Sequence, residues 1–103
     1  MQVNPTSFEG LFVLEPKVFG DERGYFFESY NAVTLKKHNL DFNWIQDNQS
    51  SSTYGVLRGL HFQKPPYAQT KLIRVLQGEI LDVVVDMRHA SPSFGKSYTI
   101  LLS

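Results

Sequence analysis

His61 and Lys71, two side chains suited to proton transfer, lie on either side of a Pro-Pro turn in the stretch RGLHFQKPPYAQTK. Histidine titrates near neutrality, and a lysine ammonium can stabilise a developing oxyanion. The two-residue period of a strand places His61 on one face with Gly59 and Gln63. The next strand can bring Lys71 into the same interior. This pattern is compatible with acid–base chemistry and names no substrate.

The surroundings of His61 argue against a metal site. Gly55 precedes His61 by six residues, which is similar to the start of the metal-binding motif of cupins, where a second histidine follows two residues later. Here that position is Gln63, and residues 64–70 contain no carboxylate. A single histidine makes a poor transition-metal site. We therefore expect no metal. A metal-dependent cupin-type dioxygenase or isomerase, and a histidine that only packs within the fold, are the alternatives.

The bulk composition bounds the classes of function. With 103 residues, the chain can form one domain with a modest core, so we expect a single domain, 1–103. Ten basic and ten acidic side chains balance, which gives no global charge for binding nucleic acid or an anionic membrane. The chain has no cysteine and no apolar run of membrane-spanning length. We expect a cytoplasmic protein without nucleic-acid or membrane partners.

The elements that must position these side chains read mostly as strands. Runs of β-forming residues, separated by turns, occur at 10–19 (broken by Pro16), 25–30 (a short strand or the entry to a helix), the start of 42–55, 56–63, 71–78, 79–88 and 97–103. One helix is expected near 31–40, with Asn31 as its N-cap and Val33, Leu35 and Leu40 as its apolar contacts. This pattern predicts an all-β sandwich or barrel.

The run 79–88 alternates with a period of two. Ile80, Asp82, Val84 and Asp86 share one face, and Leu81, Val83, Val85 and Met87 share the other. We expect the apolar face to pack and the mixed face to line a cavity, where the two aspartates support the interior or the fold. The last run, SYTILLS, stops without a turn or cap, so we expect a fold that is incomplete at the C-terminus.

Three segments carry a specific resemblance: DERGYFFESY, WIQDNQSSSTYGVLRGLH, and the run from RGLHFQ to DVVVDMR. In this order they closely resemble the dTDP-4-dehydrorhamnose 3,5-epimerase family over essentially all 103 residues. The resemblance implies the N-terminal part of a cupin-like jelly-roll β-barrel. It also implies cofactor-free epimerisation of dTDP-4-dehydro-6-deoxy-D-glucose at C3 and C5 through an enolate, in the synthesis of dTDP-L-rhamnose for cell-surface polysaccharide.

The resemblance also implies roles for individual residues. His61 corresponds to the base and Lys71 to the residue beside the sugar, while Arg58 and Arg23 correspond to contacts with the diphosphate and the nucleotide. The remaining binding residues are Glu28, near the thymine, and the loop residues Gln46, Asp47 and Asn48. Gln63 and Asp82 would support the site, and Asp82 could orient His61. From the residues alone, Arg23 and Lys71 would be interpreted as solvated charges on strands, and residues 46–48 as an ordinary turn.

Members of the family are nearly twice as long, and their proton-donating tyrosine and the aspartate partner of the histidine lie in the C-terminal half. Tyr98 falls too early to be that donor. We therefore expect a fragment or a truncated member whose activity alone is doubtful. The alternatives are a non-catalytic nucleotide-sugar-binding remnant and an epimerase that inverts only C3 or only C5. The family implies a homodimer in which N-terminal strands of one subunit reach the other's site.

Overall fold

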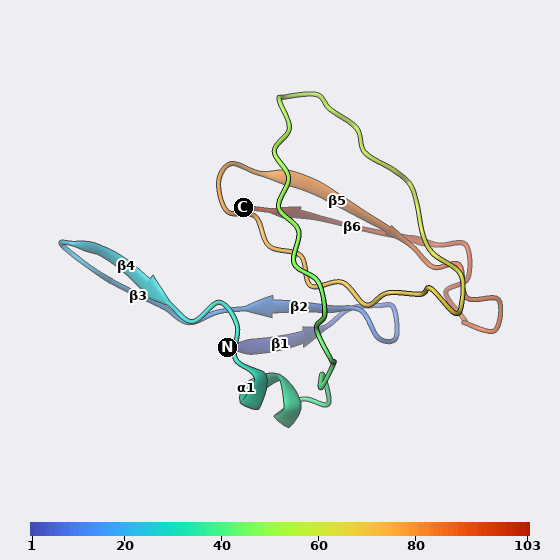
Figure 1. Cartoon of the computed structure of the whole chain (residues 1–103), viewed down its shortest axis with the longest axis horizontal. Helices are drawn as coiled ribbons and strands as arrows, with labels where there is room; N and C mark the ends of the chain where they lie inside the picture. The colour runs from blue at the N-terminus through green and yellow to red at the C-terminus, as the bar shows by residue number, and fades with distance from the viewer. The chain divides into compact units, whose positions relative to one another are not determined.

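The computed structural model describes residues 1–103 as two compact units, one of residues 1–41 with 74–103 and the other of residues 42–73. Whether they form a single domain stays a prediction. Every strand and the helix belong to the first unit (Figure 1). They are β1 (Gln2–Pro5), β2 (Phe12–Glu15), β3 (Val18–Asp21), β4 (Gly24–Phe27), α1 (Ala32–Lys37), β5 (Ile80–Val85) and β6 (Ser97–Leu102).

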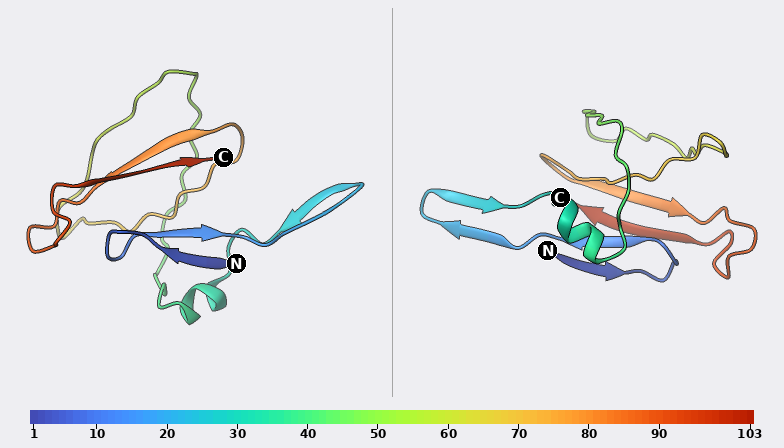
Figure 2. Two further views of the ribbon diagram at one scale, coloured as in Figure 1. Left: turned by 180° about the vertical axis from the view of Figure 1, so that it is seen from behind. Right: turned by 60° about the horizontal axis from the view of Figure 1, so that its bottom comes forward.

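The six strands form three antiparallel hairpins, β1–β2, β3–β4 and β5–β6, and no closed barrel. Pro16 separates β2 from β3, as the sequence predicted, because proline cannot donate to the ladder. Figures 1 and 2 show the β3–β4 hairpin extending away from the other two hairpins of its unit. The prediction of an all-β fold with one short helix is confirmed. Strand β1 was not predicted.

Helix α1 begins where its cap predicts. Asn31 is extended, and its Oδ1 accepts a hydrogen bond of 3.0 Å from the backbone N–H of Thr34. Leu35 is 2 % exposed and anchors the helix, whereas Val33, expected to pack, is 65 % exposed. With six residues, the helix depends on this packing more than on its own propensity. No helix of the chain combines the length and apolar character needed to cross a membrane.

The core of the first unit is small. Phe8 is 5 % exposed, and its ring lies 6.2 Å from that of Tyr98 on β6. The apolar face that we expected to pack is exposed at Leu81 and Val83 of β5, whereas Asp86, directly after the strand, is buried. Burial of Asp86 is tolerated because its carboxylate is hydrogen-bonded to Arg88, Ser91 and Ser93, which offsets the penalty of burying it.

The strands predicted within 42–55, 56–63 and 71–78 are wrong, because residues 42–79 contain neither strand nor helix. A β-strand requires a neighbour to complete its ladder of hydrogen bonds, and these runs have none in this structure. Their apolar side chains remain exposed, as with Leu57 at 90 % and Leu60 at 71 %. Propensity alone therefore does not make these runs strands.

Candidate functional site

The predicted site residues are divided between the two units. Arg23, Glu28 and Asp82 belong to the first unit, and the others belong to the second: Gln46, Asp47, Asn48, Arg58, His61, Gln63 and Lys71. All of them are exposed except Asp82, which is half-buried. Within each unit, some of these residues form hydrogen bonds with residues near them in the sequence. A single site made of residues from both units stays a prediction.

Arg23 lies at the tip of the β3–β4 hairpin, where Asp21 pairs with Gly24 across the turn. Gly24 has φ +131°, a conformation that residues with a Cβ rarely adopt. The Asp21 carboxylate accepts from the backbone N–H of Arg23 at 2.9 Å, from its Nε at 3.1 Å and from its Nη2 at 2.6 Å. These bonds lower the pKa of Asp21 and raise that of Arg23.

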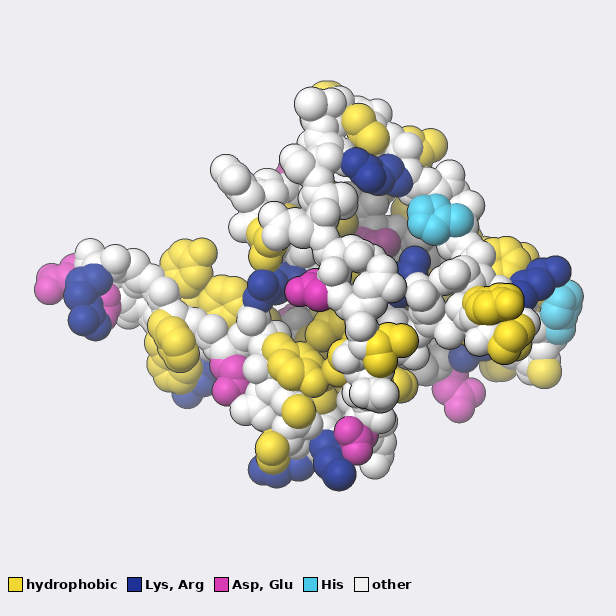
Figure 3. Space-filling model, viewed as in Figure 1, with side chains coloured by type: hydrophobic (Ala, Val, Ile, Leu, Met, Phe, Trp, Pro, Cys, Tyr) yellow, Lys and Arg dark blue, Asp and Glu magenta, His cyan; other side chains and the backbone are white.

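The flanks of this hairpin are aromatic. Tyr25 and Phe27 stack with ring centroids 5.9 Å apart, and Tyr25 and Phe26 are 75 % and 69 % exposed. Figure 3 shows charged side chains of both signs gathered at the far end of the hairpin and hydrophobic ones exposed along it. Exposed aromatic side chains in this number are typical of a surface that contacts a partner.

Glu28 lies just before helix α1 and is held by the residue that caps the helix. The Nδ2 of Asn31 donates to Oε2 of Glu28 at 2.9 Å, while Oδ1 of the same amide accepts from Thr34. Asn31 therefore connects the helix terminus to a predicted contact residue. The sequence indicated Asn31 as a cap but not as a partner of Glu28.

In the second unit, Arg58 is held by the serine-rich loop before it. Its Nε donates to Oγ of Ser52 at 2.9 Å, and its Nη2 donates to the carbonyl oxygen of Ser51 at 3.0 Å. The amide of Gln46 donates to Oδ1 of Asn48 at 3.1 Å. The predicted loop residues thus contact each other in part, and the SSS stretch at 50–52 is a signal that the sequence interpretation missed.

His61 follows a backbone that only glycine adopts easily. Gly59 has φ +118°, and a Cβ at that position would lie 3.6 Å from Nδ1 of His61. Within the second unit, the side chains of His61, Gln63 and Lys71 form no hydrogen bond or ion pair. Their roles as base and as the residue beside the sugar stay predictions.

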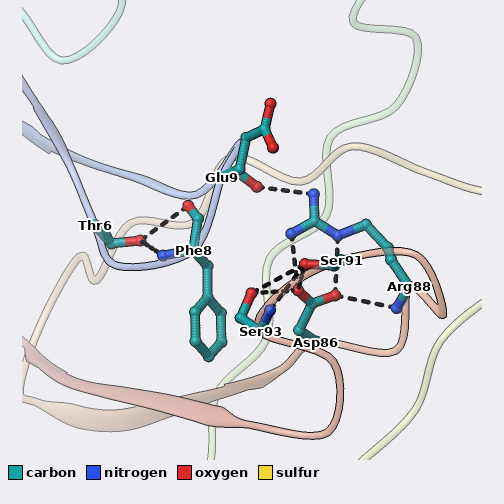
Figure 4. Close-up of polar contacts among 7 residues, drawn as sticks. All are labelled: Thr6, Phe8, Glu9, Asp86, Arg88, Ser91 and Ser93. Atoms are coloured by element: carbon teal, nitrogen blue, oxygen red, sulfur yellow. Dashed lines mark hydrogen bonds and ion pairs between the residues drawn. The ribbon is translucent and has the colours of Figure 1, made fainter.

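A polar cluster outside the predicted site lies between the β1–β2 turn and the β5–β6 loop (Figure 4). Asp86 accepts from Nε and Nη2 of Arg88, both at 2.9 Å, and from the hydroxyls of Ser91 and Ser93, both at 2.6 Å. Arg88 and then the two serines hold the pKa of Asp86 well below its usual range. Nη1 of Arg88 donates to the carbonyl oxygen of Glu9 at 2.8 Å, which ties the two hairpins together.

No group of three or more His, Cys, Asp or Glu side chains is arranged to hold a metal ion. The expectation that the protein uses neither metal nor cofactor stays a prediction.

Comparison with known proteins gives matches along almost the whole chain. The family model described as dTDP-4-dehydrorhamnose 3,5-epimerase matches residues 5–103. The chain is 50 % identical to the dTDP-4-dehydrorhamnose 3,5-epimerase of Shigella flexneri, over 100 % of this chain and 58 % of that protein. It is 47 % identical to the enzyme of the same name from Methanothermobacter thermautotrophicus, over 95 % of this chain and 52 % of that protein.

Solved structures give the same result. The epimerase of Bacillus anthracis, with TDP and PPi bound, has a TM-score of 0.94 at 50 % identity and covers 99 % of this chain and 59 % of its own. A Legionella pneumophila epimerase in complex with dTDP-4-keto-L-rhamnose has a TM-score of 0.89 at 44 % identity, covering 99 % of this chain and 54 % of its own. The chain therefore spans little more than half the length of these relatives.

Proposed function

Because the chain belongs to the dTDP-4-dehydrorhamnose 3,5-epimerase family, with the family's cupin-like jelly-roll strands, we propose that it serves epimerisation of dTDP-4-dehydro-6-deoxy-D-glucose at C3 and C5. The observation that carries this proposal is the family match over residues 5–103, which includes His61, Lys71 and both nucleotide-side arginines. The product would be dTDP-4-dehydro-L-rhamnose, a precursor for polysaccharide.

The proposed chemistry follows from the position of the ketone. C3 and C5 both neighbour the C4 carbonyl, so removal of either proton gives an enolate. His61 would take the proton, since a neutral imidazole is a base near neutral pH. The ammonium of Lys71 would stabilise the charge that develops on the enolate oxygen. Inversion is completed by an acid on the opposite face of the sugar, a role that we assign to no residue of this chain.

The proposed binding residues match the chemistry of a nucleotide sugar. Arg23 and Arg58 would hold the diphosphate, because a guanidinium presents parallel donors to phosphate oxygens. Glu28 would accept hydrogen bonds on the thymine side, and loop 46–48 would line the sugar site. Gln63 and Asp82 would support the site, Asp82 by orienting His61.

A second candidate is a protein that binds the nucleotide sugar without turning it over. The local contacts favour it: Arg23 and Arg58 are each held by neighbouring oxygens before any ligand binds, which would suffice for binding. An epimerase that inverts only C3 or only C5 is a further form of the first candidate. The site of isotope exchange separates these functions.

We further propose that the protein acts in the cytoplasm as a homodimer, with the β3–β4 hairpin contributing to the interface. The exposed rings of Tyr25 and Phe26 support this proposal. Light scattering should give twice the mass of the chain, and a Tyr25→Ser/Phe26→Ser variant should shift toward the monomer. A wild-type protein that stays monomeric at high concentration would contradict it.

Solvent deuterium exchange tests the catalytic part. The chain is incubated in D2O with dTDP-4-dehydro-6-deoxy-D-glucose, and exchange at C3 and C5 is followed by NMR. The His61→Asn variant should lose about 100- to 10,000-fold in exchange rate, the usual contribution of a general base. His38→Asn makes the same chemical change at another exposed histidine and should keep the wild-type rate.

The outcomes separate the candidates. Exchange at both carbons that depends on His61 supports the epimerase, and exchange at one carbon supports the single-centre form. Binding without exchange supports the binding protein. Wild-type exchange in the His61→Asn protein would remove His61 as the base, and a stoichiometric bound transition metal would restore the metal-dependent alternative.

A further inference from the structure

The tip of the β3–β4 hairpin holds Arg23 in one orientation, and we propose that Asp21 is the positioning residue that presents its guanidinium to a phosphate oxygen of the nucleotide. This inference rests on the proposed function, which places Arg23 in contact with the nucleotide diphosphate. The side chain of Arg23 is 86 % exposed, so nothing except Asp21 restrains it. Restraint before binding reduces the rotamer entropy lost when the ligand arrives.

The hydrogen bonds leave the correct donors free. A guanidinium has five N–H groups, and Asp21 engages the Nε–H and one N–H of Nη2. Both N–H groups of Nη1 and the second N–H of Nη2 remain free, and one N–H of each of these nitrogens points along the outer edge of the guanidinium. This outer edge has the fork geometry that fits two phosphate oxygens. The carboxylate and a phosphate can therefore bind the same arginine at once.

A second arginine in the chain, Arg88, binds an aspartate and a further oxygen at the same time. Asp86 holds Arg88 through the backbone N–H, Nε and Nη2, the same three donors with which Arg23 meets Asp21. Nη1 of Arg88 still donates to a third oxygen, the carbonyl of Glu9, at 2.8 Å. At Arg23 no protein oxygen occupies the corresponding position. A ligand oxygen would complete the same set of contacts.

A simpler electrostatic view makes the opposite prediction. A carboxylate beside an anion site repels the anion, so its removal should tighten binding. A positioning residue should weaken binding when it is lost, despite the more favourable charge. The sign of the change therefore distinguishes the two roles.

The test measures the dissociation constant of TDP by isothermal titration calorimetry with the full chain. Asp21→Asn should weaken binding by about three- to tenfold, the cost of ordering one flexible side chain. Glu22→Gln is the matched control, since Glu22 lies in the same turn, makes no side-chain hydrogen bond and loses the same charge. It should leave binding unchanged or slightly tighter. Arg23→Ala should weaken binding by about tenfold or more.

The double variant Asp21→Asn/Arg23→Ala provides the readout that a structural role would not change. If Asp21 acts through Arg23, the double variant should bind like Arg23→Ala alone. Tighter or unchanged binding by Asp21→Asn, together with weak binding by Arg23→Ala, would overturn the positioning role and leave the proposed function intact. Absence of TDP binding by the wild-type chain, or no effect of Arg23→Ala, would overturn the proposed nucleotide contact and the inference with it.

Discussion

Two Asp-x-Arg segments, 21–23 and 86–88, form nearly the same hydrogen bonds in opposite environments. At 86–88 the aspartate side chain is 2 % exposed, and the arginine is 54 % exposed. At 21–23 these fractions are 50 % and 86 %. The buried pair receives two serine hydroxyls and connects to Glu9, whereas the exposed pair has no further partner. The same local motif is therefore buried and connected to other residues in one place, and exposed with unpaired donors in the other.

The difference follows from the solvent around the two carboxylates. An exposed ion pair exchanges its bonds with water and contributes little to stability. A buried carboxylate that loses its partners has no water to replace them, so the loss is costly. Substitutions in 86–88 should consequently change stability, and substitutions in 21–23 should change ligand binding.

The largest effect on stability should come from Asp86→Ala. Loss of this carboxylate removes the charged acceptor of the Ser91 and Ser93 hydroxyls, which then have only the contact with each other, and it releases Arg88 from the β5–β6 loop. Urea unfolding followed by circular dichroism should show the lowest midpoint of all the variants described here, or no folded baseline. A midpoint equal to that of Asp21→Ala would mean that burial does not distinguish the two pairs.

The pH dependence of stability should trace mainly to Asp86. Its pKa is lowered in the folded protein, so its stabilisation is complete above the unfolded value of about 4 and disappears as the pH falls toward the folded value. Unfolding midpoints measured from pH 7 to pH 2 should fall steeply below about pH 4 in the wild type. The decline should be shallower in Asp86→Asn. Asp21→Asn should keep the wild-type profile, because solvent screens its exposed pair.

A smaller loss is expected when one serine is removed. Ser93 is 7 % exposed and donates to Oδ2 of Asp86 at 2.6 Å. Ser93→Ala should lower the free energy of unfolding by about 1–3 kcal/mol, typical of a lost bond to a buried charged group. Ser91→Ala should cost less, since Ser91 is only half-buried and water can reach the vacated position. The reverse order in urea unfolding would contradict this account of the cluster.

The smallest effect on stability is expected at the hairpin tip. Asp21→Asn should leave the urea midpoint within experimental error, and 0.5 M salt should not change that result, because the pair is already screened. Its effect should instead appear in TDP binding. A clear loss of stability in Asp21→Asn together with unchanged TDP binding would contradict the difference that we infer between the two segments.

Much of the local structure could be predicted from residue spacing. The Asn31 cap, the break at Pro16 and the strand within 97–103 each depend on near neighbours, and each is confirmed in the structure. The strands expected at 56–63 and 71–78 are absent for the opposite reason. Their spacing is strand-like, but a ladder requires a partner, and spacing says nothing about the partner.

The candidate site shows the same division. The family resemblance predicted which residues to consider, and the chemistry of each could be argued from its type. It did not indicate Asp21, Ser52 or the second role of Asn31, because these residues act on a predicted residue through side-chain geometry. The roles of His61 and Lys71 stay predictions that isotope exchange can test.

By itself, the sequence determined the family, the all-β class and the position of the one helix, since these depend on motif order and on local periodicity. Only the tertiary structure decided that Asp86 is buried while Asp21 is exposed, and that Leu81 and Val83 of β5 remain exposed. Burial depends on residues that are remote in the chain, such as Glu9 and Arg88, 79 positions apart. Two Asp-x-Arg segments that look alike in sequence therefore lie in different environments in the folded protein.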